Sequence, residues 1–359
     1  MQDSVIPNTR HQIKPYRKWA NLFNVHSWAP AYYEVNANDV AAMDFFPGAV
    51  LLSQDLLGNL TSSAGYSWRD YHAFHAALTY KGLYPVFDFR IDCGGRTSIL
   101  GQPQDRIFNT HNIKTRMSVR SYIPFSFTRS RWITGVVPQI RFTYDNVYFY
   151  LPATNSFQYG LKEMGYSLQA YRYQKTSMRD FAPRIGVLVQ GMFQHAPWNT
   201  GQLGHIYYMY GRVYLPGVAP HHSLQVSGAW QAQKTERFLF GSALRFPRGY
   251  LTGRTEKLSI ATIDYGFPIC YPDWNLNFLA YLKRLRTNLF CDIAQNQYRK
   301  VENNRLIWHQ ENLRSVGIDL LADVNFLRIN FPVNIGIRTT YALKTKEMQP
   351  ELLFSVSFN

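Results

Sequence analysis

Short segments in which apolar and polar residues alternate recur along the whole chain. The clearest spans residues 328–338, and its odd-numbered apolar positions are Ile329, Phe331, Val333, Ile335 and Ile337. The opposite face carries Arg328, Asn330, Asn334 and Arg338. A period of two residues is typical of a β-strand. One face suits hydrocarbon and the other suits water, which is the pattern of a wall between lipid and a wet interior.

Counting such segments predicts about sixteen strands. The first strand is expected near His26 to Val35, and eleven strands precede a long loop around residues 236–250. The five later strands are predicted at 258–267, 285–293, 315–324, 327–339 and 351–358. Short and long connections alternate between them, and an even number of strands permits closure. We therefore predict an all-β, closed antiparallel transmembrane β-barrel over residues 19–359, preceded by a leader or linker from the periplasmic side over residues 1–18.

Composition favours this fold over a helical membrane protein. Tyr 25, Phe 24 and Trp 8 make the chain 16% aromatic, as expected where rings form girdles at both membrane interfaces. Mean hydropathy is −0.27, and no run approaches the roughly 18 apolar residues of a spanning helix. No Pro/Ser-rich linker or shift in composition divides the chain. A half-buried sheet of a soluble protein is the alternative interpretation of the alternating segments.

The N-terminus lacks the apolar stretch of a signal peptide, so the sequence is expected to be a mature chain or a fragment. Cys93, Cys270 and Cys291 lack the paired spacing of a metal site. Local sequence yields no Ser-His-Asp or paired-carboxylate constellation and no phosphate-binding glycine motif. We therefore expect no enzyme, no cofactor and no metal.

The chain has a net charge of +15, and its basic residues alternate with apolar residues and do not cluster. This argues against nucleic acid as a partner and instead places basic side chains on the water-facing side of the strands. The residues expected to face the lumen are Arg90, Lys114, Arg116, Arg120, Arg328 and Arg338. A lumen with this charge would favour anions, so a pore is one functional interpretation.

The long loop and the strands after it resemble the BamA/TamA superfamily of outer-membrane assembly barrels, also called bacterial surface antigens. The family has a Glu-Arg-Phe lead-in, a glycine pair and an aliphatic-Arg-Gly-aromatic tip on its sixth extracellular loop. Here 236–238 reads ERF, 241–242 reads GS and 247–250 reads PRGY. Two strand signatures follow, matched by DYGFP at 264–268 and FCDIA at 290–294. The departures are Ser242, Pro247, Asp264 and Ala294.

The resemblance implies that the loop folds back into the lumen, with Arg248, Gly249 and Tyr250 at its tip. Its expected partners on the wall are Asp292, Phe290, Asp264 and Tyr265. Asp292 alternates with apolar neighbours and so faces the lumen, where its carboxylate could form a bidentate pair with the Arg248 guanidinium. The alternative is an Arg248 side chain that is simply solvated on an exposed tip.

The resemblance also implies a role in inserting or translocating other proteins at the bacterial outer membrane. The working edge would be the seam between the first and last strands, marked by His26, Val35, Glu351, Phe354 and Phe358. Pro30 would remove one hydrogen-bond donor from that seam. Assembly members of the family carry POTRA repeats before the barrel, and the residues before Trp19 are too few for one. The chain is therefore expected to be the barrel portion of a longer protein, or to have lost the family function or passed it to a partner.

Expected partners are outer-membrane lipid and lipopolysaccharide, a periplasmic domain or accessory proteins, and client membrane or secreted proteins. The alternative to an assembly role is a passive barrel anchor or an anion-favouring pore or transport protein.

Overall fold

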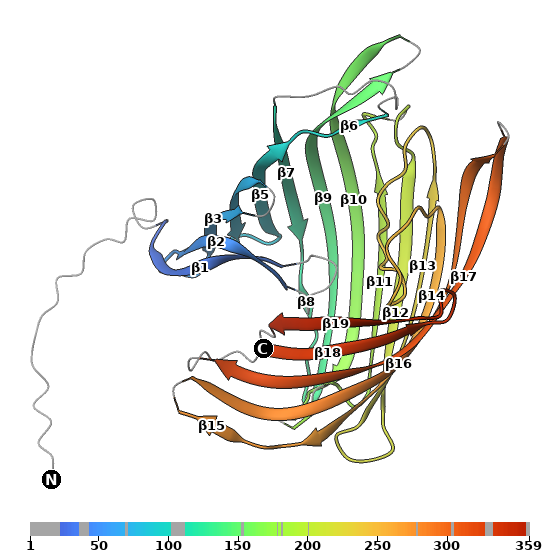
Figure 1. The fold of residues 1–359 in the computed structure, drawn as a ribbon. Coiled ribbons are helices and arrows are strands. Elements are labelled where there is room, and N and C mark those ends of the chain that lie inside the picture. The colour runs from blue at the N-terminus through green and yellow to red at the C-terminus, as the bar shows by residue number, and fades with distance from the viewer. Residues whose placement is uncertain are drawn as a thin grey trace, which may run out of the picture.

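The computed structural model describes residues 22–35, 43–68, 71–101, 112–151, 154–177, 179–180, 182–199, 201–277, 279–302, 305–326 and 333–356. Within them the chain forms one sheet of nineteen strands (Figure 1). The strands are β1 Val25–Val35, β2 Met43–Gln54, β3 Leu60–Trp68, β4 His72–Tyr80, β5 Val86–Arg96, β6 Ile99–Leu100, β7 Ile113–Tyr122, β8 Phe125–Ser126, β9 Trp132–Leu151, β10 Ser156–Gln174, β11 Gly186–His195, β12 His205–Pro216, β13 Ser223–Lys234, β14 Lys257–Cys270, β15 Trp274–Leu276, β16 Ala280–Glu302, β17 Arg305–Phe326, β18 Val333–Ala342 and β19 Glu347–Val356.

Three of these strands are only two or three residues long, namely β6, β8 and β15. The other sixteen form an antiparallel meander in which each strand pairs with the next long strand along the chain. Eleven of them lie before the 235–256 connection and five after it, so the predicted count of sixteen is confirmed for the described part of the chain. Figure 1 shows the meander curling into a curved wall.

Strand bounds were predicted less well than strand number. β16 and β17 are 23 and 22 residues long and extend well past the predicted 285–293 and 315–324. The strand predicted at 327–339 begins at Val333 in the described residues and ends at Ala342, and 327–332 lies outside them. β19 begins four residues before the predicted Glu351. Turn residues mark where a reversal occurs, but the length of a ladder depends on the partner strand, which local sequence does not contain.

Pro30 and Pro138 lie at positions that lack a ladder partner on one side of the strand. Pro30 lies at the register shift between Ala29 and Ala31 in the β1–β2 pairing. Pro138 precedes Gln139, which forms the last β7–β9 pair with Tyr122, and it has a ladder partner only on its other side, Leu168 of β10. Proline in a sheet is tolerated at bulges and where one side of the strand is unpaired.

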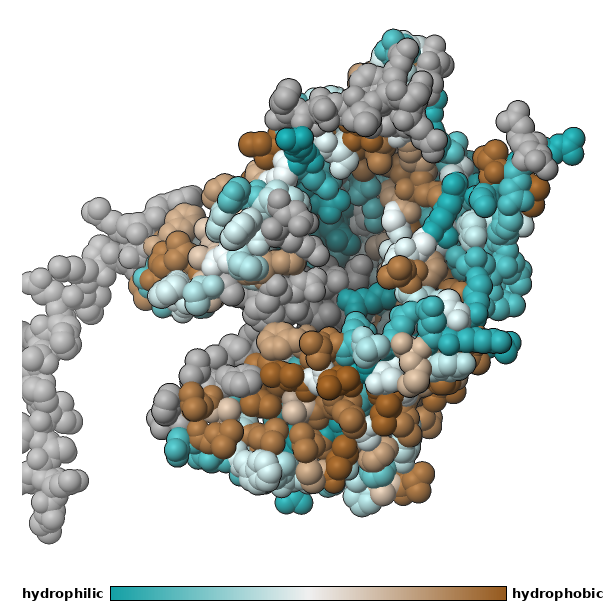
Figure 2. Space-filling view, in the orientation of Figure 1, coloured by the Kyte–Doolittle hydropathy of each residue, from teal (hydrophilic) through white to brown (hydrophobic). Residues whose placement is uncertain are grey.

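The two faces of the sheet differ in polarity as the alternation predicted. On β18, Ile337 is 53% exposed while Asn334 on the other face is buried. On β7, Met117 and Val119 are exposed on the face opposite Arg120. Figure 2 shows apolar side chains gathered over the outer surface of the last strands, with hydrophilic side chains toward the hollow of the wall. An outer apolar band with a polar inner face is the arrangement of a transmembrane barrel.

Closure of the barrel stays a prediction. β1 pairs with β2 and β19 pairs with β18, and no ladder joins β1 to β19 within the described residues. The alternating pattern fixes which face of a strand is apolar, but it carries no information on whether the two end strands hydrogen-bond to each other. Within the described residues β1 and β19 are thus the end strands of the meander, and β19 approaches β2 without a ladder between them. The predicted segment 1–18 lies outside the described residues.

Candidate functional site: the 235–256 loop and the polar face of the sheet

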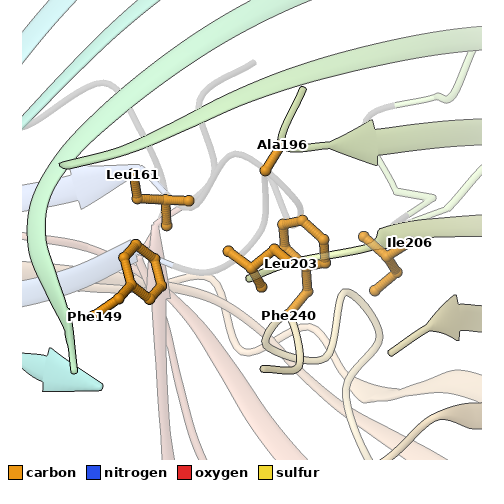
Figure 3. Packing of buried hydrophobic residues seen from close by; sticks show 6 residues of the cluster. All are labelled: Phe149, Leu161, Ala196, Leu203, Ile206 and Phe240. Atoms are coloured by element: carbon orange, nitrogen blue, oxygen red, sulfur yellow. The ribbon is translucent and has the colours of Figure 1, made fainter. Parts of the chain in front are cut away.

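The connection between β13 and β14 packs on the polar face of the sheet. Phe240 of this connection is 8% exposed and lies among Phe149, Leu161, Ala196, Leu203 and Ile206, as Figure 3 shows. Farther along, Leu244 joins a second buried cluster with Met192, Tyr208, Leu258, Ala294 and Leu313. Two apolar anchors from one loop, each inserted among strands far apart in sequence, hold the loop to the wall.

Two glutamines of β13 bind the backbone of the same loop. The side-chain oxygen of Gln231 accepts hydrogen bonds from the N–H groups of Ala243 and Leu244, at 2.9 and 3.1 Å. Gln233 accepts from the Phe240 N–H at 3.0 Å and donates to the Thr255 carbonyl at 2.6 Å. Gln231 is fully buried, so its amide replaces the water that these backbone groups would otherwise bind. Neither glutamine was predicted from the sequence. Their positions, two residues apart on one face of the strand just before the loop, could have indicated that both side chains point toward the loop.

Replacing Gln231 with Met should loosen the loop, because two buried N–H groups would lose their acceptor. Each such group costs about 1–3 kcal/mol when left unsatisfied. The expected result is faster protease cleavage between residues 235 and 256 in the folded barrel. Gln225→Met on the same strand is the matched control, since Gln225 lies on the same polar face, nearer the other end of β13. Equal cleavage rates in the two variants would contradict the assignment.

The tip of the loop is a tight turn over residues 247–250. The Tyr250 N–H donates to the Pro247 carbonyl at 3.1 Å, and Gly249 has φ of +81°. A positive φ at the third position is the geometry of a type II turn, which favours glycine. A Cβ at Gly249 would also lie 2.8 Å from the Thr340 side chain. Gly249 is therefore required both by the turn and by its close approach to β18.

Arg248 reaches two carboxylates on neighbouring strands. Its Nε and Nη2 donate to the two oxygens of Asp292, at 2.8 and 2.6 Å, and its Nη1 donates to Asp264 at 2.8 Å. The Arg248 backbone N–H adds a further bond to Asp292 at 3.0 Å. Side-chain exposure is 18% for Arg248 and 3% for Asp292. The fork of donors is thus matched to a buried carboxylate, the geometry in which charge-assisted pairs are strongest.

Aromatic contacts complete the surroundings of the loop tip. The Arg248 guanidinium carbon lies 3.6 Å from the centre of the Phe290 ring, and Arg338 approaches the same ring at 5.5 Å. The Tyr250 hydroxyl donates to the Arg314 carbonyl at 2.8 Å and accepts from the Lys344 N–H at 3.1 Å. Asp292, Asp264 and Phe290 are therefore brought together with Arg248 and Tyr250.

Tyr265 is the predicted loop partner that lies elsewhere. It follows Asp264 on β14, so its side chain projects from the opposite face of the strand. Its hydroxyl contacts the β12–β13 turn, accepting from the Val218 N–H at 3.3 Å and lying 2.8 Å from Nδ1 of His222. The family motif contains Asp264 and Tyr265 as neighbours, whereas adjacent residues of a β-strand point to opposite faces of the sheet.

Four of the six basic residues expected to face the lumen are paired with carboxylates. Arg90 contacts Asp92, Arg116 contacts Asp145, Arg120 contacts Asp88 and Arg338 contacts Asp319. Lys114 shares the face of Arg116 on β7, and Arg328 lies outside the described residues. The sequence predicted the side of the wall on which these arginines lie, but it did not predict their partners, which come from adjacent strands.

Four of the five residues expected at the seam lie on the end strands β1 and β19. His26 is exposed on β1 with Nδ1 2.6 Å from the Ser27 hydroxyl, and Val35 is the last residue of β1. On β19, Glu351 lies 3.5 Å from Arg338, and Phe354 is 50% exposed. Phe358 lies outside the described residues.

Glu256 lies at the base of the loop, and its ionisation makes the stability of the fold depend on pH. It is 2% exposed, and it accepts from Arg299, through both backbone and side chain, and from the Thr235 hydroxyl. Burial alone would raise the pKa of Glu256, but the bonds from Arg299 and Thr235 and the Arg299 charge lower it below its ordinary value of 4.5. The carboxylate therefore stabilises the fold above this value, and that contribution is lost as pH falls through the lowered pKa.

Glu256→Gln should lower the midpoint of thermal unfolding at pH 7 but change it little in acid. At pH 7 the wild-type protein has charge-assisted bonds worth about 1.5–3 kcal/mol each, which the amide loses. As pH falls below the ordinary value of 4.5 and through the lowered pKa of Glu256, the wild-type carboxyl also becomes neutral, so the two melting curves should converge. A difference that is constant from pH 7 to pH 3 would show that the charge of Glu256 does not matter.

No helix in the described ranges is long and apolar enough to cross a membrane. No cluster of three or more His, Cys, Asp or Glu side chains there could hold a metal ion.

Comparison with known proteins places the fold. No protein-family model and no curated protein sequence matches the chain. Among solved structures, it is similar to BamA from Haemophilus ducreyi lacking POTRA domains 1–3, at a TM-score of 0.52 and 10% identity, over 92% of this chain and 69% of that one. It is also similar to CdiB from Escherichia coli, at a TM-score of 0.49 and 11% identity, over 87% of this chain and 58% of that one. With its sixteen long antiparallel strands, its apolar outer face and its polar inner face, the chain has the fold of an outer-membrane β-barrel of the BamA type.

Proposed function

We propose that this protein lies in the bacterial outer membrane and takes part in inserting or translocating other proteins there. The observation that supports the proposal is the BamA-type fold, in which no ladder joins the end strands β1 and β19 within the described residues. A strand at a free edge presents unpaired N–H and C=O groups along its length. An incoming strand can bind to such an edge by β-augmentation, which requires backbone pairing but little sequence specificity.

The features of the two edges suit a seam that opens. In the β1–β2 ladder the register shifts twice, between Val25 and Ser27 and between Ala29 and Ala31 around Pro30. Shifts of this kind weaken a ladder locally and bend the strand. Phe354 and Leu352 of β19 are 50% and 82% exposed, so the last strand offers an apolar face to lipid or to a client strand. Outer-membrane lipid, lipopolysaccharide and unfolded client barrels are therefore the partners we expect.

The 235–256 loop would lie in the lumen as an inward-folded plug. The apolar anchors Phe240 and Leu244 and the Arg248–Asp292 pair support this part of the proposal, since all three attach the loop to the polar face of the wall. A loop fixed in this way would stiffen the β13–β17 side of the barrel. Movement would then be left to the seam on the other side.

A passive pore is the second candidate, and the ion pairs of the polar face argue against an anion-selective one. Arg90, Arg116, Arg120 and Arg338 each have a carboxylate partner, so their charges are largely compensated locally. If the loop is a plug, deleting residues 238–252 should raise single-channel conductance in a planar bilayer well above that of the intact barrel. Equal conductance with and without the loop would show that it does not obstruct the lumen.

Depletion of the protein in its host tests the assembly role directly. The abundance of unrelated outer-membrane barrels and secreted proteins would be measured by quantitative proteomics of isolated outer membranes. Loss of a defined set of such proteins, restored by re-expression, is the expected result and would identify the clients. An unchanged outer-membrane proteome would overturn the assembly role and leave an anchor or a pore.

A further inference from the structure

Three side chains on adjacent strands near the start of the sheet have the arrangement of a serine nucleophile with its base. The Ser67 hydroxyl on β3 lies 2.9 Å from Nε2 of His75 on β4. On the other side of the ring, Nδ1 of His75 lies 2.6 Å from Oδ1 of Asp92 on β5. We propose that Ser67, His75 and Asp92 form a nucleophilic triad that accepts an acyl group from short-acyl carboxylic esters. This activity goes beyond the proposed assembly role and does not depend on it.

Strand pairing explains why three residues so placed in the sequence meet. Gly65 is the cross-strand partner of His75, and His75 is the partner of Asp92. Ser67 is two residues from Gly65, on the same face of β3, within reach of the imidazole. All three project from the polar face, since their neighbours Trp68, Phe74 and Ile91 are exposed on the apolar side. Local sequence could not reveal the group, because only the strand register brings its members together.

The surroundings hold the imidazole in one orientation. The Tyr32 ring of β1 stacks on His75 with centroids 4.0 Å apart and planes 13° apart. Arg90 donates from Nε to both oxygens of Asp92, at 3.1 and 2.9 Å, which fixes the carboxylate. With Asp92 accepting from Nδ1–H, the unprotonated Nε2 faces the serine hydroxyl. This is the tautomer that a general base requires, and triads are recognised by such geometry and not by chain order.

Access to the nucleophile sets the size of the acyl group. Ser67 is 6% exposed, whereas the side chains of His75 and Asp92 are 15% and 25% exposed. The ladder neighbours of Ser67 are Gly48 on β2 and Ala73 on β4, so no side chain larger than a methyl group stands beside the hydroxyl at these two positions. An acyl group on Ser67 would have to be small, because the hydroxyl is nearly buried and the Tyr32 ring covers the neighbouring Gly65 and stacks on His75.

The reaction follows from the three roles. Ser67 Oγ bonds to the ester carbonyl carbon while its proton passes to His75 Nε2, and the proton then passes to the leaving oxygen, which departs as the alcohol. Water then attacks the acyl carbon of the acyl-serine, and one of its protons passes to His75 Nε2. The bond from the acyl carbon to Ser67 Oγ breaks, the carboxylic acid leaves, and the proton on Nε2 returns to Ser67. Backbone N–H groups of β3 are engaged by strands on both sides, so strong oxyanion stabilisation is not expected. Reactive esters should therefore acylate Ser67 far faster than unactivated ones.

The test uses the full chain folded in detergent micelles, with a small alkyl fluorophosphonate as probe and p-nitrophenyl acetate as substrate. Mass spectrometry of the labelled peptide is expected to place the adduct on Ser67. Ser67→Ala should abolish labelling. His75→Gln and Asp92→Asn should reduce it by about 10²- to 10⁴-fold, the range found when members of such a unit are removed. Folding of each variant would be checked by its heat-dependent gel migration.

Ser63→Ala is the matched control. Ser63 lies four residues earlier on the same face of β3, where its ladder partners are Leu52 and Ala77 and not a histidine. This variant should label like the wild type. If folded wild-type protein does not react, or if the adduct lies on a residue other than Ser67, the proposal is overturned. The position of the adduct on the wild-type chain decides the question even where a variant fails to fold.

Discussion

Arg248→Ala should markedly lower the temperature at which the folded barrel unfolds in detergent. The substitution removes three side-chain hydrogen bonds from the loop to the wall and leaves the Asp292 carboxylate, which is 3% exposed, without its guanidinium partner. Breaking a buried pair by removing one partner costs about 3–5 kcal/mol, because the remaining charge is left uncompensated. The measurement is the loss of the compact, fast-migrating form on gels after heating to a series of temperatures.

Asp292→Ala should give the same phenotype, because it removes the acceptor of both the Arg248 side chain and the Arg248 backbone N–H. Arg254→Ala serves as the control, since Arg254 is an exposed arginine of the same loop. It should melt like the wild type. If both Arg248→Ala and Asp292→Ala retained the wild-type profile, the loop would not be held by this pair, and Arg248 would have to be regarded as a solvated residue.

Covalent locking of β1 to β19 should abolish the proposed assembly activity. The activity requires an edge to which a client strand can bind, and a cross-link across the seam removes that freedom while leaving the rest of the wall unchanged. A panel of cysteine pairs, one in Val25–Val35 and one in Glu347–Val356, would be introduced after replacing the three native cysteines, which are free in the structure. Client abundance would be measured under oxidising conditions and again after reduction.

The control for this experiment is a cysteine pair at Ile337 and Leu352. These are cross-strand neighbours in the β18–β19 ladder, so their disulfide joins two strands that are already paired. Locking the seam should deplete clients in a manner that a reductant reverses, and the control disulfide should have no effect. Normal client levels with a fully cross-linked seam would exclude strand exchange at this edge as the mechanism.

The sequence was informative wherever a property repeats along the chain. A period of two residues predicted sixteen strands, the apolar outer face and the polar inner face, because each strand reports its own two faces through its own side chains. The resemblance predicted Arg248, Asp264, Phe290 and Asp292 as a set, and Arg248 contacts the other three. Tyr265 was wrongly included, since it contacts Val218 and His222 on the other face.

What the sequence alone determined is therefore the repeating pattern of the wall, and what the tertiary structure decided is everything that joins distant strands. Local alternation fixes which way each side chain points, but partners depend on register, and register is a relation between two strands. Register therefore decides which carboxylates pair with the basic side chains, and it places Gln231 and Gln233 against the loop. It also brings Ser67, His75 and Asp92 together. Whether the end strands β1 and β19 pair is a question of the same kind, because the amides of an end strand are identical in sequence whether or not another strand pairs with them.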